Sequence, residues 1–131
     1  MRTFTEQMLV LDTDSAVVTR PLDTKNYKCA KITLIADASY DGDVTFVGSD
    51  SDLPLDFSNS ADATNPYAPI EVIDYDTGNA IPGSTGITYA SSASVRTFEV
   101  SSNGNKILGI ITSGATGGNL KAYLTLFDGT E

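Results

Sequence analysis

An alternation of apolar and polar residues with a period of two constrains this chain more than any other sequence feature. Between residues 28 and 38 every second residue from Ala30 to Ala36 is apolar, and residues 120–127 repeat the pattern from Leu120 to Leu126. This period is typical of half-buried β-strands, and good helix formers occur in no sustained run. The sequence therefore predicts an all-β chain.

Turn residues divide this pattern into eight to nine strands. Asp41-Gly42 and Asn103-Gly104 predict tight hairpins, because these dipeptides favour the positive φ of such turns. Residues 95–100, 106–112 and 120–127 are expected to form an antiparallel meander. The other expected strands are residues 7–11, 16–19, 28–38, 44–48, 70–73 and 86–90.

This spacing favours a single antiparallel β-sandwich of the jelly-roll type, with a closed barrel as the alternative. We expect an N-terminal arm at residues 1–8 and the sandwich domain at residues 9–131. One long loop, at residues 49–69, contains Leu53, Leu55, Phe57 and Tyr67, which are expected to hold it against the domain.

The residue inventory argues against enzymatic chemistry. With no His and one Cys, the chain lacks the parts of a Ser-His-Asp triad and of a His- or Cys-ligated metal site. Asp76-Thr77-Gly78 matches the catalytic tripeptide of aspartic proteases, but the flanking residues differ and a plain β-turn is the simpler interpretation. A dimeric acid protease remains a minor alternative. No enzyme activity and no cofactor are expected.

The net charge of −9 is concentrated in the middle of the chain. Residues 32–76 hold ten acidic residues and no Lys or Arg. Such a surface repels phosphates, so no nucleic acid partner is expected. A solvated acidic face is the simplest interpretation, and Ca²⁺ binding by Asp50, Asp52 and Asp56 is the alternative. No apolar stretch reaches the length of a membrane span, so no membrane partner is expected.

Several apolar and aromatic residues are candidates for a protein interface. The arm and first strand supply Phe4, Met8, Leu9 and Leu11, on an edge without Lys or Pro; Tyr67, Tyr123 and Phe127 are aromatic residues in the long loop and on the outward positions of the last strand. Tyr and Phe are enriched at interfaces. Sugar stacking and ordinary core packing are the alternatives for the aromatic residues. Self-association is expected.

The segments Thr33–Asp50 and Arg96–Leu126 resemble small β-sandwich proteins of tailed-bacteriophage particles. The shared pattern is a strand, then Gly42-Asp-Val-Thr-Phe-Val-Gly-Ser-Asp50, then a later hairpin, a Ser-Gly…Gly turn and an alternating last strand. The resemblance implies a virion structural protein made in the host cytoplasm. It implies capsid decoration, with the major capsid protein or another virion protein as partner. A carbohydrate-binding or adhesin-like module of a tail fibre is the alternative.

Overall fold

The computed structural model describes residues 7–15, 17–24, 27–101 and 106–127. In this part of the chain there are eleven strands and no helix, and hence no helix long and apolar enough to cross a membrane. The strands are β1 (Met8–Thr13), β2 (Leu22–Asp23), β3 (Cys29–Ala36), β4 (Asp43–Ser49), β5 (Ala68–Pro69), β6 (Val72–Asp74), β7 (Ala80–Ile81), β8 (Ile87–Thr88), β9 (Ser94–Ser101), β10 (Ile107–Ser113) and β11 (Leu120–Phe127). The all-β expectation is confirmed. The expected eight to nine strands are too few, because strands of two residues carry no recognisable period.

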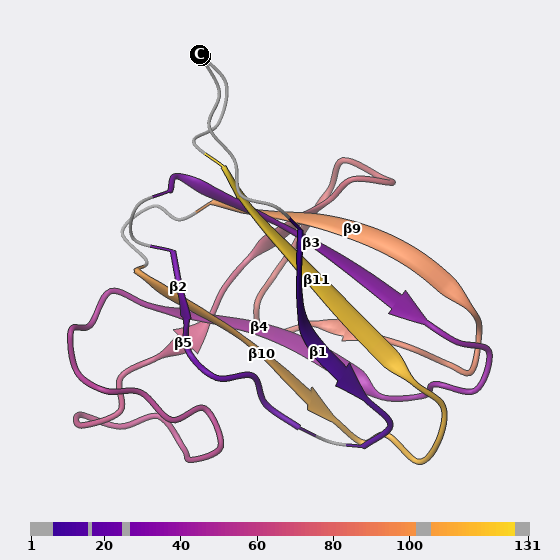
Figure 1. Ribbon diagram of the computed structural model, residues 1–131, viewed down its shortest axis with the longest axis horizontal. Coiled ribbons are helices and arrows are strands. Elements are labelled where there is room, and N and C mark those ends of the chain that lie inside the picture. Colours follow the sequence, from indigo (N-terminus) through magenta and orange to yellow (C-terminus); the bar gives the residue numbers. More distant parts are fainter. Residues whose placement is uncertain (1–6, 16, 25–26, 102–105, 128–131) are drawn as a thin grey trace.

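The strands form two antiparallel sheets that share one core (Figure 1). The first sheet has the order β1-β11-β3-β9-β6-β7, and the second has the order β2-β10-β4-β5, with β8 also paired to β4. Pairing is nested along the chain: β1 pairs with β11, β2 with β10, β3 with β9 and β4 with β5. The first and last strands of the chain are therefore neighbours.

The period-two pattern correctly predicts which faces of the strands are buried. On β11 the residues from Leu120 to Leu126 alternate buried and half-buried, and β3 buries every second residue from Ala30 to Ala36. Phe98 of the first sheet meets Phe46 of the second, with ring centroids 5.7 Å apart. Because β11 and β3 pair along their whole length, their buried faces form one continuous wall of the core.

The expected hairpin at Tyr40–Asp43 is wrong. This segment joins β3 to β4, which belong to different sheets. Tyr40 is fully buried, and a Cβ added at Gly42 would lie 2.5 Å from its hydroxyl oxygen. Gly42 does not have a positive φ. The sequence needs glycine here for space beside the Tyr40 ring, and not for a hairpin turn.

The expected meander of the last three strands is also wrong. β9 and β11 lie on either side of β3 in the first sheet, whereas β10 lies between β2 and β4 in the second. Alternation predicts the faces of a strand but carries no information on its neighbours. Of the expected strand at residues 16–19, the described residues form only one isolated bridge, between Val18 and Ile111. Asn103-Gly104 lies outside the described residues.

Two connections between the sheets meet at one end of the molecule and enclose Tyr40. The Asp41 carboxylate accepts hydrogen bonds from the N–H and the hydroxyl of Thr116, in the β10–β11 connection. The Asp37 N–H donates to the carbonyl of Asn119 at 3.0 Å. Gly118 has φ of 80°, and a Cβ there would overlap the backbone of Tyr40. Both connections therefore depend on close packing at glycine.

We predict that Gly118→Ala destabilises the fold by at least about 2 kcal/mol, because the new Cβ meets backbone and the positive φ is strained. Gly117→Ala is the matched control: a Cβ there meets nothing within 4 Å, and φ is not positive. The control is expected to change stability by less than about 0.5 kcal/mol. Urea unfolding of both variants measures the difference. Equal stabilities would contradict this account of the two connections.

Candidate functional site

The β4–β5 loop, residues 50–67, is the longest irregular segment among the described residues, and it protrudes from the second sheet (Figure 1). Asn65 organises it from within. Its Oδ1 accepts from the Asp56 N–H at 2.8 Å, and its Nδ2 donates to the Asp56 carbonyl at 2.8 Å. The Tyr67 hydroxyl donates to the carbonyl of Asn59. Side chains thus replace the backbone pairing that a loop lacks.

Phe57 anchors this loop to the outer face of the second sheet. The side chain is 3% exposed and lies over Gly109 of β10, where a Cβ would overlap the ring. Tyr67 packs edge-on against Phe57, with centroids 5.1 Å apart. Two of the four residues expected to hold the loop down therefore pack together. Leu55 is half-buried, whereas Leu53 is 49% exposed.

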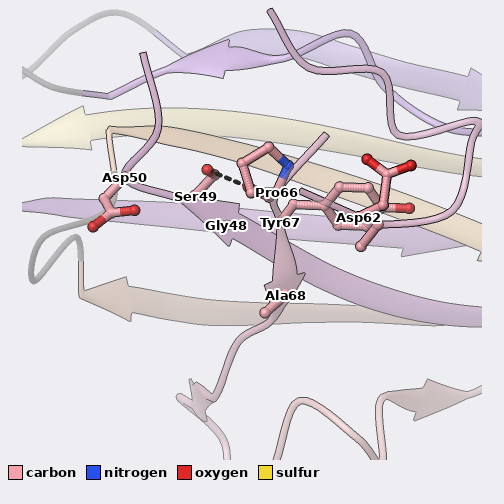
Figure 2. Close-up of a pocket in the computed structure, with 8 residues that line it drawn as sticks. Gly48, Ser49, Asp50, Asp62, Pro66, Tyr67 and Ala68 are labelled. Carbon is pink, nitrogen blue, oxygen red and sulfur yellow. Dashed lines mark hydrogen bonds between the residues drawn. The ribbon is translucent and has the colours of Figure 1, made fainter. Parts of the chain in front are cut away.

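A groove of about 560 Å³ runs between the β4–β5 loop and the end of β4 (Figure 2). It is lined by Gly48, Ser49, Asp50, Ala61, Asp62, Pro66, Tyr67 and Ala68. The Ser49 hydroxyl donates to the Pro66 carbonyl at 2.6 Å and fixes one wall. Asp62 and Tyr67 both line the groove, and Asp50 lies on the opposite side of Ser49 in this view (Figure 2). Backbone and hydroxyl hydrogen bonds from Thr64 lower the pKa of Asp62, so it is a hydrogen-bond acceptor at neutral pH.

Asp50, Asp52 and Asp56, the three acids considered for Ca²⁺ binding, each have different contacts in the structure. Lys106 Nζ contacts Asp52 Oδ1 at 3.0 Å, while Asp56 accepts hydrogen bonds from Ser58 and Asn59. Asp50 lines the groove. Within the described ranges, no three His, Cys, Asp or Glu side chains are grouped to hold a metal ion.

The Asp76-Thr77-Gly78 tripeptide forms the turn between β6 and β7. The Gly78 N–H donates to the Asp74 carbonyl at 2.7 Å, and Gly78 has φ of 73°. Asp76 is exposed, whereas the buried carboxylate is that of Asp74. It accepts from Arg96 at 2.7 Å and from the Asp76 N–H at 2.9 Å. The carboxylate that is held by hydrogen bonds is thus that of Asp74, which lies outside the tripeptide. It holds the turn against β9 through Arg96.

The structure brings together only some of the predicted interface residues. Met8 and Leu9 are 40% and 51% exposed on β1, and Leu9 pairs with the half-buried Tyr123 of β11. Phe127 is half-buried at the far end of β11. Leu11 is 6% exposed and packs in the core. Tyr67 lies apart from this group in the β4–β5 loop, and Phe4 lies outside the described residues.

Sequence analysis missed two exposed apolar residues on the two central strands of the first sheet, β3 and β9. Val95 of β9 is 68% exposed, and its register partner on β3, Ile35, is 37% exposed. The alternation did place both on outward positions, opposite the buried residues of their strands. Alternation shows on which face of the strand a residue lies, but it does not show how exposed an aliphatic residue on that face is. In the register of the sheet both residues lie in the same row as Lys121 and Asp12, one outward row away from Tyr123 and Leu9.

Comparisons with known proteins concern the fold. No protein-family model matches the chain, and no curated protein matches its sequence. Among solved structures, the chain is similar to the crystal structure of the SPBc2 prophage-derived protein YomS, with a TM-score of 0.71. The likeness covers 98% of this chain and 96% of that chain, at 5% sequence identity. The fold is therefore one that a prophage-derived protein also has.

We predict that Asp74→Asn destabilises the fold by about 1–3 kcal/mol at neutral pH, because the partly buried Arg96 loses its anionic partner. Asp76→Asn is the matched control and is expected to cost less than about 0.5 kcal/mol. Burial raises the pKa of Asp74, but hydrogen bonds from Arg96 and the Asp76 N–H outweigh it and the pKa is lowered.

The sign of the pH dependence follows from that lowered pKa. The stabilisation by Asp74 is present above the unfolded carboxyl pKa of about 4 and is lost as pH falls through the lower folded value. Urea unfolding at a series of pH values measures it. The Asp74→Asn variant should lose less stability on acidification than the unmodified chain; identical acid profiles would show that the ion pair does not contribute.

We predict that Gly109→Ala and Phe57→Ala are strongly non-additive. Each alone displaces or removes the Phe57 ring from the second sheet, at an expected cost of about 1.5–3 kcal/mol. In the Phe57→Ala background, Gly109→Ala should cost little, because no ring remains for the Cβ to overlap. A double-mutant cycle of urea unfolding measures the coupling, and simple additivity would show that Phe57 does not anchor the loop at Gly109.

Proposed function

We propose that this chain is a non-enzymatic structural protein of a tailed-bacteriophage particle, acting through protein–protein contacts. Within the particle we assign it the role of a capsid decoration or stabilising subunit bound to a shell protein. The observation that carries the proposal is the likeness of fold to a prophage-derived protein over 98% of the chain. The sequence resemblance at Thr33–Asp50 and Arg96–Leu126 supports it independently.

The nested strand pairing supports assigning the fold to the jelly rolls. In a jelly roll a long hairpin is folded over into two sheets, so that the first of eight strands pairs with the last, and so on inward. Here β1, β2, β3 and β4 pair with β11, β10, β9 and β5 in that manner. Jelly rolls include viral capsid domains, and this class of fold agrees with a structural role.

The distribution of charge supports an outward-facing position on the particle. Asp50, Asp56 and Asp62 are exposed in the β4–β5 loop, within the stretch of ten acids at residues 32–76. A surface of this sign is repelled by packaged DNA. We therefore place the β4–β5 loop on the water-facing side of the shell, and the shell contact elsewhere on the molecule.

We predict that the chain is a component of particles made by the genome that encodes it. Particles purified through two successive density gradients, then probed with antiserum to the purified chain, provide the measurement. The chain should band with the particles at a constant ratio to the major capsid protein. An abundant acidic protein of the host cytoplasm serves as the control for carry-over and should be depleted between the gradients.

A chain found only in the soluble fractions would overturn the particle assignment. The groove beside Tyr67 would then favour the alternative of a carbohydrate-binding module, because an aromatic ring flanked by carboxylates can contact a sugar and accept its hydroxyl protons in hydrogen bonds. Glycan binding by the purified chain that is lost in Tyr67→Ala would support this alternative.

A further inference from the structure

In the part of the chain that the structure describes, three of the four sheet edges have features that disfavour strand addition. β7 and β2 are two residues long, with Pro82 following one and Pro21 preceding the other. The third edge lies beside β4, where β5 and β8, also of two residues each, cover the side of β4 that faces away from β10, and β5 contains Pro69. Short edges and proline are devices by which β-proteins avoid pairing with other chains.

The remaining edge, β1, is neither short nor interrupted by proline. It is six residues long, Met8–Thr13, and contains no Pro and no Lys. It pairs with β11 on one side, and no other strand of the described residues pairs with it. The one edge-protecting feature on this strand is a bulge at Val10, which shifts its register with β11. Met8 and Leu9, two of the six exposed large apolar residues in the described part of the chain, both lie on this strand.

We propose that β1 pairs in antiparallel fashion with β1 of a second copy of this chain, so that two six-stranded sheets become one continuous sheet across a two-fold axis. This inference goes beyond the particle role proposed above. It concerns a contact between two copies of this chain, in addition to the contact with a shell protein. An edge strand with unpaired backbone groups and apolar side chains is the kind of surface that strand addition uses, and a two-fold contact needs only one self-complementary patch.

The position of the charged residue on β1 favours antiparallel over parallel pairing of the two copies. Asp12 is the only charged residue of β1 and lies near its C-terminal end, beside Lys121 of β11 in the sheet register. Antiparallel pairing centred on Met8–Leu11 puts the two Asp12 carboxylates at opposite ends of the joint. Parallel pairing would put them side by side, which destabilises a sheet. The ten acids of residues 32–76 are not part of the strand.

Sedimentation velocity of the purified chain over a range of concentrations tests the proposal. The expected result is a monomer–dimer equilibrium, with no larger species. Leu9→Lys is expected to raise the dissociation constant at least tenfold, because a lysine at the joint must leave water or hold the strands apart. Met8→Lys should do the same, and circular dichroism confirms that both variants are folded.

Val95→Lys is the matched control. Val95 is exposed on the same sheet, but it lies on β9, away from β1 and beyond β11 and β3. This variant should dimerise like the unmodified chain. A monomer at all concentrations, a dimer that survives Leu9→Lys and Met8→Lys, or a dimer lost in Val95→Lys would each overturn the proposal. Because this experiment uses no particles, its failure leaves the test of the particle role unaffected.

Discussion

The position of Tyr40 determines much of the rest of the structure. Its fully buried ring fills the end of the molecule where β3 crosses to β4 and β10 crosses to β11. Both connections pass close to it at glycine, at Gly42 and Gly118. β11 begins two residues after the second of these glycines and runs between β3 and β1. The edge strand that we propose as the contact surface is therefore held in place by a strand whose start depends on this packing.

The same device, an aromatic ring over a glycine, fixes the acidic loop. Phe57 lies on Gly109 in the centre of the second sheet, and Tyr67 packs against Phe57 from the other end of the loop. A glycine in a central strand leaves a depression on the outer face, and the ring fills it. The loop consequently presents Asp50, Asp56 and Asp62 on a fixed support. The surface thus has two distinct regions: the β4–β5 loop is acidic, and the β1 edge is apolar.

The sequence correctly predicted which face of each regularly alternating strand is buried, but it did not predict which strands are neighbours in the sheets. The buried residues of β3 and β11 were predicted from alternation, and so were the turn at Asp76-Thr77-Gly78 and the anchoring of the long loop by Phe57 and Tyr67. The hairpin and the meander failed, because a strand that crosses to the opposite sheet has the same period as one that turns back. Gly42 was misinterpreted for a related reason: a glycine beside a buried ring looks in sequence like a glycine in a turn. The Asp74–Arg96 pair was missed, since nothing local in the sequence brings residues 22 positions apart into contact.

Among the described residues, β1 is the one sheet edge left open for association. Hydrogen exchange of the backbone amides, measured at protein concentrations below and above the dimerisation range, tests it most directly. The account predicts that amides of Met8–Thr13 exchange more slowly at the higher concentration, while those of Ser94–Thr97 on β9 do not change. Exchange in β1 that is independent of concentration, or protection that appears on β9 instead, would contradict it.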